Sequence, residues 1–171
     1  MNTEIGEYLV GAYLKILKDV DIVDYNARPP GGGLAGLSEM DVIGLDLKGS
    51  VAYLCEVTTH TQGILYGDYD KTMEKLEAKY KRQQEYAEKY LSHFARKEFM
   101  FWSPVVPNGR LLDRMRQIEG WQIIVNEDYA ERFDELVAKA KELSHDTGNP
   151  VFRLLQIMAR LRRRPKDEAG K

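Results

Sequence analysis

The segment that most constrains the fold lies between Ser38 and Thr61, with the sequence SEMDVIGLDLKGSVAYLCEVTTHT. Its apolar and β-branched residues predict two β-strands, Met40–Leu47 and Val51–Thr58. The short polar stretch Lys48-Gly49-Ser50 between them is typical of the tight turn of a hairpin. We therefore expect the rest of the chain to be organised around this hairpin.

The position of the turn decides which side chains face each other. With Lys48-Gly49 as a two-residue loop, Asp41 lies opposite Glu56, with Cβ atoms about 5 Å apart, on one face of the hairpin. The apolar pairs on the same face are then Leu45 with Ala52 and Ile43 with Leu54. With Gly49-Ser50 in the loop, Asp41 faces Thr58 and Glu56 is diagonal to it. Either register leaves the two carboxylates within reach of one ion, and such a pair is typical of a shared proton or a bound hard cation such as Mg²⁺.

The elements around the hairpin alternate between helix and strand. An amphipathic helix over 3–18, capped by Asn2 or Thr3, and a strand over 20–28 precede it. The later elements are a helix over 68–91, a strand over 97–106, a helix over 109–119, a strand over 120–126 and helices over 127–143 and 151–164. This alternation predicts parallel later strands, and so an α/β domain with a central mixed sheet flanked by helices.

Length and composition limit the number of domains, the kinds of partner and the location that we expect for this chain. A chain of 171 residues forms one domain, which we expect to span 1–171. The net charge of −2 limits any nucleic-acid surface to a local patch. The single cysteine, Cys55, is expected to be a buried structural thiol. The segment Gly31–Gly33 lacks phosphate-loop spacing and is expected to be a flexible connection. Without an apolar run of membrane-spanning length or a signal sequence, the expected location is cytoplasmic.

Asp41 on one strand, followed by Glu56-Val57-Thr58 on the next, resembles the PD-(D/E)XK nuclease superfamily, the restriction-endonuclease-like and Holliday-junction-resolvase-like group. The α-β-β-β-α-β order of that superfamily's core matches residues 3–106, to which this chain adds C-terminal helices. The resemblance implies a metal-dependent endonuclease that hydrolyses DNA phosphodiester bonds. Asp41, Glu56 and the main-chain carbonyl of Val57 would then bind Mg²⁺ or Mn²⁺.

Glu7, near the core face of the first helix, has two interpretations. It is a boundary residue that reaches water or, from the resemblance, the first-helix acid of resolvase-type members, which Leu9 and Val10 follow at the matching positions. In the second case Glu7 joins the metal site directly or through water.

The chain departs from the family pattern at Thr58, where the usual lysine would stand two residues after Glu56. A threonine hydroxyl can hold a water molecule but carries no charge. Some members of the superfamily supply the cation from the following helix, and there Lys75 and Lys79 lie one turn apart, so either could point back over the hairpin.

The missing lysine also supports a second hypothesis, a catalytically inactive nuclease-fold module for nucleic-acid binding or protein interaction, with contacts through Arg160 and the arginines 162–164. A solvated, disordered basic tail over 160–171 is the alternative reading of those arginines. The partner implied by the resemblance is nucleic acid, DNA before RNA, and many relatives form homodimers, although the sequence indicates no dimer surface.

Overall fold

The computed structural model describes residues 3–29, 39–64 and 66–162. Its elements are α1 (Ile5–Leu17), β1 (Ile22–Ala27), β2 (Met40–Asp46), β3 (Val51–Val57), α2 (Tyr69–Tyr90), β4 (Arg96–Ser103), α3 (Arg110–Arg116), β5 (Trp121–Val125), α4 (Glu127–Glu142) and α5 (Pro150–Leu161). The predicted helices and strands are confirmed in the predicted order, with ends that differ by a few residues. The expected connection at Gly31–Gly33 and the arginines 163 and 164 lie outside the described residues.

The strands form one mixed sheet in the order β1-β2-β3-β4-β5. The first three pair antiparallel, and β3, β4 and β5 pair parallel. Parallel neighbours need a crossover, which the helices α2 and α3 provide. The sheet therefore confirms the predicted parallel arrangement of the later strands.

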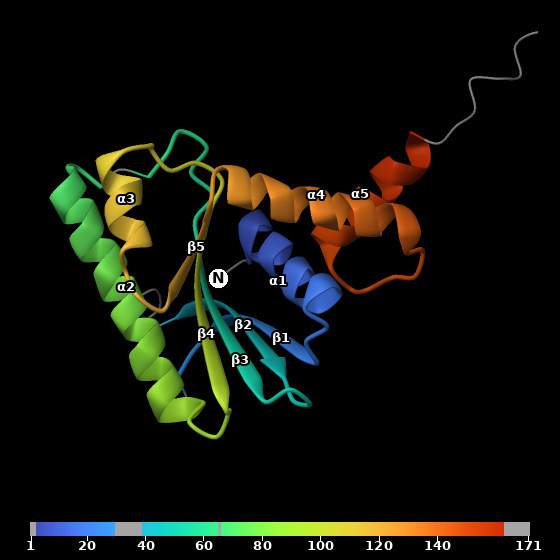
Figure 1. The fold of residues 1–171 in the computed structure, drawn as a ribbon. Helices are drawn as coiled ribbons and strands as arrows, with labels where there is room; N and C mark the ends of the chain where they lie inside the picture. The colour runs from blue at the N-terminus through green and yellow to red at the C-terminus, as the bar shows by residue number, and fades with distance from the viewer. Residues whose placement is uncertain (1–2, 30–38, 65, 163–171) are drawn as a thin grey trace, which may run out of the picture.

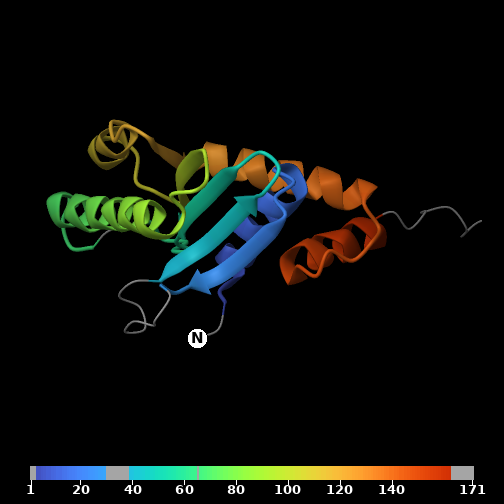
Figure 2. The same cartoon turned by 90° about the horizontal axis from the view of Figure 1, so that it is seen from below.

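Helices cover both faces of the sheet, as Figures 1 and 2 show: α1, α4 and α5 lie on one face and α2 and α3 on the other. The side chains of β3 alternate between these layers. Tyr53 and Cys55 belong to the core beneath α1 and α4, whereas Ala52 and Leu54 belong to the core beneath α2. Cys55 is buried, as predicted. No helix in the described ranges is long and apolar enough to cross a membrane.

The hairpin adopts the first of the two registers. Ile43 lies opposite Leu54 and Leu45 opposite Ala52. The turn itself differs from the prediction, because β2 ends at Asp46 and four residues, 47–50, form the turn. The turn closes on the Asp46 carboxylate, which accepts the Gly49 backbone N–H at 2.7 Å. Ser50, and not Gly49, takes the positive φ of 53°.

Helix α1 begins later than predicted. Its N-cap is Glu4 and not Thr3, and Asn2, the other predicted cap, lies outside the described residues. The Glu4 backbone N–H donates to Glu7 Oε2 at 3.0 Å, and the Glu4 side chain accepts from the backbone N–H of Glu7 in return. This capping box satisfies two otherwise unpaired backbone donors. A helix capped by Glu4 is therefore more stable than one that begins earlier in the chain. As a result Glu7 is held at the first turn of the helix.

Gly11 allows α1 to approach β1 closely. A Cβ atom at this position would lie 2.0 Å from Tyr25 Oη. The Tyr25 hydroxyl is held in place because it accepts a hydrogen bond from Asn149 Nδ2 at 3.2 Å, and Asn149 also donates to the Tyr8 carbonyl at 2.7 Å. The absence of a side chain at Gly11 thus allows α1, β1 and the N-terminal end of α5 to pack against one another.

We expect Gly11→Ala to lower the free energy of unfolding by about 1–3 kcal/mol, because the added methyl group overpacks the contact with Tyr25. In a Tyr25→Ala background the same change should be neutral or stabilising, since alanine is favoured over glycine inside a helix by about 1 kcal/mol. Urea denaturation of the four proteins measures both values. An equal loss in the two backgrounds would show that the close contact is not the cause.

Candidate active site

The candidate site lies where β2 begins and β3 ends, on the α2 face of the sheet. Because Val42 pairs with Cys55, the next residues along, Asp41 and Glu56, meet at the open end of the hairpin. Glu56 is only 1% exposed. Asp41 Oδ2 accepts the Val57 backbone N–H at 2.7 Å, and a hydrogen bond joins the two carboxyl groups. The two acids are therefore held together by the hairpin itself.

Lys79 reaches this pair from α2. Its ammonium group forms an ion pair and hydrogen bond with Glu56 Oε2. Helix α2 is held over the strands by the buried Gln83 side chain, which donates to the carbonyls of Leu54 and Met100 at 3.0 and 3.1 Å. Because Lys79 and Gln83 are one turn apart, this anchor also directs Lys79 toward the carboxylates.

The charges of the site strongly affect one another. Burial raises the pKa of Asp41. Burial and then the charge of Asp41 raise the pKa of Glu56 to about 7, although Lys79 opposes this shift. Burial alone would lower the pKa of Lys79, but Glu56 and Asp41 outweigh it and raise that pKa. Near neutral pH the two acids therefore take up or release a proton beside a fixed positive charge.

The two candidate lysines have different surroundings. Lys75 Nζ lies 4.5 Å from the centroid of the Tyr66 ring, whereas Lys79 contacts Glu56. Both line a groove of about 540 Å³. The full lining is Tyr66, Lys75, Ala78, Lys79, Lys81, Arg82 and Glu85. The sequence does not point to Tyr66, because this residue lies in a loop without periodicity. It does not point to Arg82 either, because a charged residue is ordinary on the exposed face of a helix.

Glu7 approaches the site from α1, on the opposite face of the sheet. It is 8% exposed, so the interpretation of Glu7 as a boundary residue that reaches water is wrong. Glu7 Oε2 also accepts Asn26 Nδ2 at 3.0 Å. Burial, with a smaller contribution from the charge of Asp41, raises the pKa of Glu7. The charges of Glu7 and Asp41 therefore lie close enough to interact weakly.

Thr58 lies one residue beyond the end of β3. Its backbone N–H donates to the Trp102 carbonyl at 2.9 Å, which continues the pairing of β3 with β4. Alternation along an extended chain then predicts that the Thr58 side chain lies on the same face as Glu56.

The donors of the site suit a hard divalent cation. In the described ranges, no group of three or more His, Cys, Asp or Glu side chains is placed to hold a metal ion. Asp41 and Glu56 supply two carboxylates, and the Val57 carbonyl belongs to the residue whose backbone N–H donates to Asp41. Mg²⁺ is commonly bound in this way, by one or two carboxylates, with water on its other positions. These residues fit Mg²⁺, because their oxygen atoms are hard ligands and because Mg²⁺ commonly takes only one or two carboxylates from a protein.

Comparisons with other proteins leave the resemblance to PD-(D/E)XK nucleases as a sequence-based expectation. No protein-family model, no curated protein and no solved structure matches the chain. The chemistry of the site has to be inferred from its own residues.

Proposed function

We propose that the chain is a metal-dependent endonuclease with a restriction-endonuclease-like core, and that it hydrolyses DNA phosphodiester bonds. The observation that carries this proposal is the pair formed by the half-buried Asp41 and the buried Glu56, with Lys79 against Glu56. Two carboxylates side by side, one of them buried, are costly for a fold, and a functional centre is a physical reason to retain them. The order of elements from α1 to β4 supports the proposed core.

Each residue has a role in this proposal. Asp41, Glu56 and the Val57 carbonyl hold Mg²⁺ or Mn²⁺, which when bound acidifies a coordinated water molecule and offsets phosphate charge. Glu7 adds negative charge from the opposite face of the sheet. Lys79 is a largely buried, fixed cation beside the reacting phosphate, where it stabilises developing negative charge. It replaces the lysine that the family pattern has at the position of Thr58.

The groove beside Lys79 provides a path for the nucleic acid. Lys75, Lys81 and Arg82 line it, with Glu85 as the single acid among the described lining residues. Positive side chains along a groove bind a phosphate backbone, and an aromatic ring such as that of Tyr66 can stack on a base. This arrangement favours a polyanionic substrate.

Metal titration followed by a cleavage assay tests the proposal. We expect calorimetry to detect Mg²⁺ or Mn²⁺ binding to the wild type and no binding to the Asp41→Ala, Glu56→Ala double variant. Plasmid nicking should be lost in parallel, while circular dichroism shows that the variant is folded. The nuclease proposal would be refuted if the wild type neither binds these metals nor nicks DNA when they are added.

A catalytically inactive module for nucleic-acid binding or protein interaction is the second candidate. The ion pair between Lys79 and Glu56 favours it, because this contact neutralises part of the site without a metal. In that case DNA affinity should be the same with and without Mg²⁺, in the wild type and in Asp41→Ala alike.

A further inference from the structure

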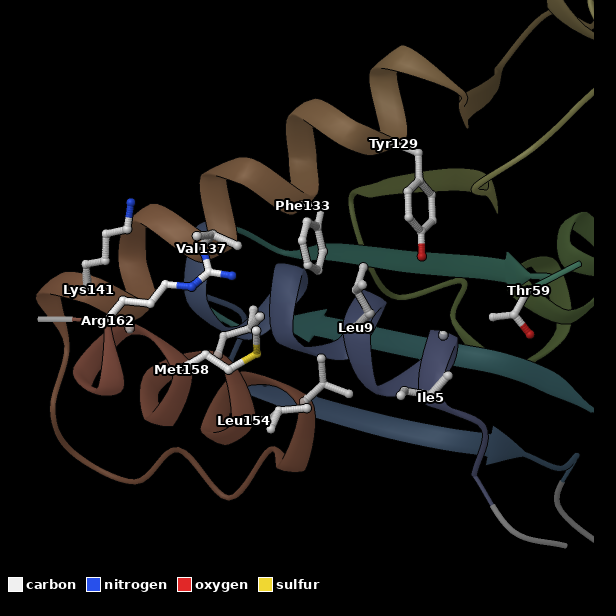
Figure 3. Close-up of a pocket in the computed structure, with 14 residues that line it drawn as sticks. Ile5, Leu9, Thr59, Tyr129, Phe133, Val137, Lys141, Leu154, Met158 and Arg162 are labelled. Carbon is white, nitrogen blue, oxygen red and sulfur yellow. The ribbon is translucent and has the colours of Figure 1, made fainter. Parts of the chain in front are cut away.

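A second groove lies between α1, α4 and α5, on the face of the sheet opposite Lys79 (Figure 3). Its volume is about 600 Å³. Aliphatic and aromatic side chains form its walls, among them Leu9, Phe133, Val137, Leu154 and Met158. Small-molecule sites commonly measure about 300–1,000 Å³. The groove is therefore large enough for a small apolar ligand.

The charges of this groove are confined to one end. Among the described residues that line it, only Lys141 and Arg162 are charged, and none is acidic. Lys141 lies in the last turn of α4 and Arg162 is the C-cap of α5, and Figure 3 shows both at the same end of the groove. Thr59 and the Tyr129 hydroxyl lie toward the other end. The groove thus combines a long apolar wall with one positive end.

Apolar side chains at the rim are open to water. Ile5 is 67% exposed, Leu154 50% and Met158 40%. Single exposed apolar residues are ordinary, but a cluster of them around an apolar hollow marks a binding surface.

We propose that this groove binds one long-chain carboxylate, with its acyl chain along Leu9, Phe133 and Met158 and its carboxylate at Lys141 and Arg162. A ligand with one anionic end and an apolar tail matches the distribution of charge. Sugars and nucleotides need polar partners along their whole length, which these walls do not provide. A second copy packed through α5 fits less well, because α5 and its C-cap carry Arg153, Arg160 and Arg162 and no acid.

Titration of the full chain with decanoate, dodecanoate and tetradecanoate, each below its micelle concentration, tests the proposal. We expect one site per chain and an affinity that rises about fourfold for each added methylene group until the groove is filled. Dodecanol should bind at least tenfold more weakly than dodecanoate, because it lacks the charge. Added salt should weaken the binding of dodecanoate and leave that of dodecanol unchanged.

Variants separate the two ends of the groove. Arg162→Gln and Lys141→Gln should weaken the binding of dodecanoate and leave that of dodecanol unchanged, whereas Met158→Gln should weaken both. Ile157→Gln is the matched control, because Ile157 is a 48% exposed residue of α5 outside this groove. Leu154→Gln replaces Met158→Gln if that variant fails to fold.

Four results would overturn the proposal. Affinity that does not depend on chain length, or equal losses in Ile157→Gln and Met158→Gln, would show non-specific adsorption. If Arg162→Gln and Lys141→Gln lower thermal stability but do not weaken the binding of dodecanoate, the two cations only stabilise the C-terminal ends of their helices. Concentration-dependent dimers in sedimentation, abolished by Met158→Gln, would make a second copy the occupant.

Discussion

For the nuclease proposed above, we expect the replacement of Lys79 with methionine to reduce plasmid nicking by about 10²–10³-fold, the usual effect of removing one group that stabilises charge in a transition state. The reason is its position: Lys79 is the cation paired with Glu56 at the carboxylate pair. Lys75→Met is the matched control from the same helix. Because Lys75 lies over the Tyr66 ring, its loss should weaken DNA binding a few-fold and leave the maximal rate nearly unchanged.

Metal binding distinguishes this role from a structural one. Without Lys79 the two carboxylates lose a competing positive charge, so Lys79→Met should bind Mg²⁺ at pH 8 at least as tightly as the wild type. Retained metal binding with lost cleavage is the expected combination. Full nicking activity in Lys79→Met would show that the cation comes from elsewhere, and loss of metal binding would assign Lys79 to holding the acids in place.

The hairpin could be predicted from sequence because its signals are local. Apolar residues of period two fixed the faces of β2 and β3, and the short polar stretch between them limited the register to two choices. The loops of the two registers lie one residue apart, which moves the residue opposite Asp41 by two, and in the observed register the Asp46 side chain closes the turn on Gly49. That contact depends on side-chain geometry, which the alternating pattern does not encode.

The choice between Lys75 and Lys79 needed the three-dimensional structure. Residues four apart share one face of a helix, so the pattern could not separate them. The rotation of α2 about its axis decides which of the two lysines contacts Glu56. Buried side chains of α2 set that rotation, among them Met73, Leu76 and Gln83. The polar member of this set, Gln83, has the appearance of a surface residue in the sequence.

Contacts between distant segments account for what sequence reasoning missed. Asn26, which binds Glu7, is a positive-φ residue of β1, and nothing in its neighbourhood indicates a partner on α1. The groove beside Lys141 and Arg162 likewise requires α4 and α5 to end at the same place. Periodicity identifies each helix but says nothing about how two of them align.

The raised pKa values of Glu56 and Asp41 imply that the metal-free fold loses stability as the pH rises toward neutral. The pKa of Glu56 is 4.5 in its ordinary state and about 7 in the folded chain. Between these values the folded protein binds more protons than the unfolded chain, so the free energy of unfolding falls as the pH rises. For Glu56 alone the loss from pH 4 to pH 8 is about 3 kcal/mol. The raised pKa of Asp41 acts in the same direction.

Asp41→Asn should remove most of this loss. The asparagine Oδ1 can still accept the Val57 N–H, while Glu56 keeps Lys79 and loses its like-charged neighbour. In urea denaturation without metal, we expect the variant to be more stable than the wild type by about 1–3 kcal/mol at pH 8 and nearly equal to it at pH 5. The exposed Asp113→Asn is the control and should show no such difference.

Added Mg²⁺ should reverse the order of stability. The wild type gains stability from the ion in proportion to the logarithm of its concentration, and Asp41→Asn gains none, because one of the two carboxylates is missing. A variant that is less stable than the wild type at pH 8 without metal would show that Asp41 contributes to folding by its charge. In that case the acid pair would be a structural feature of the hairpin, and the case for a metal centre would lose its energetic basis.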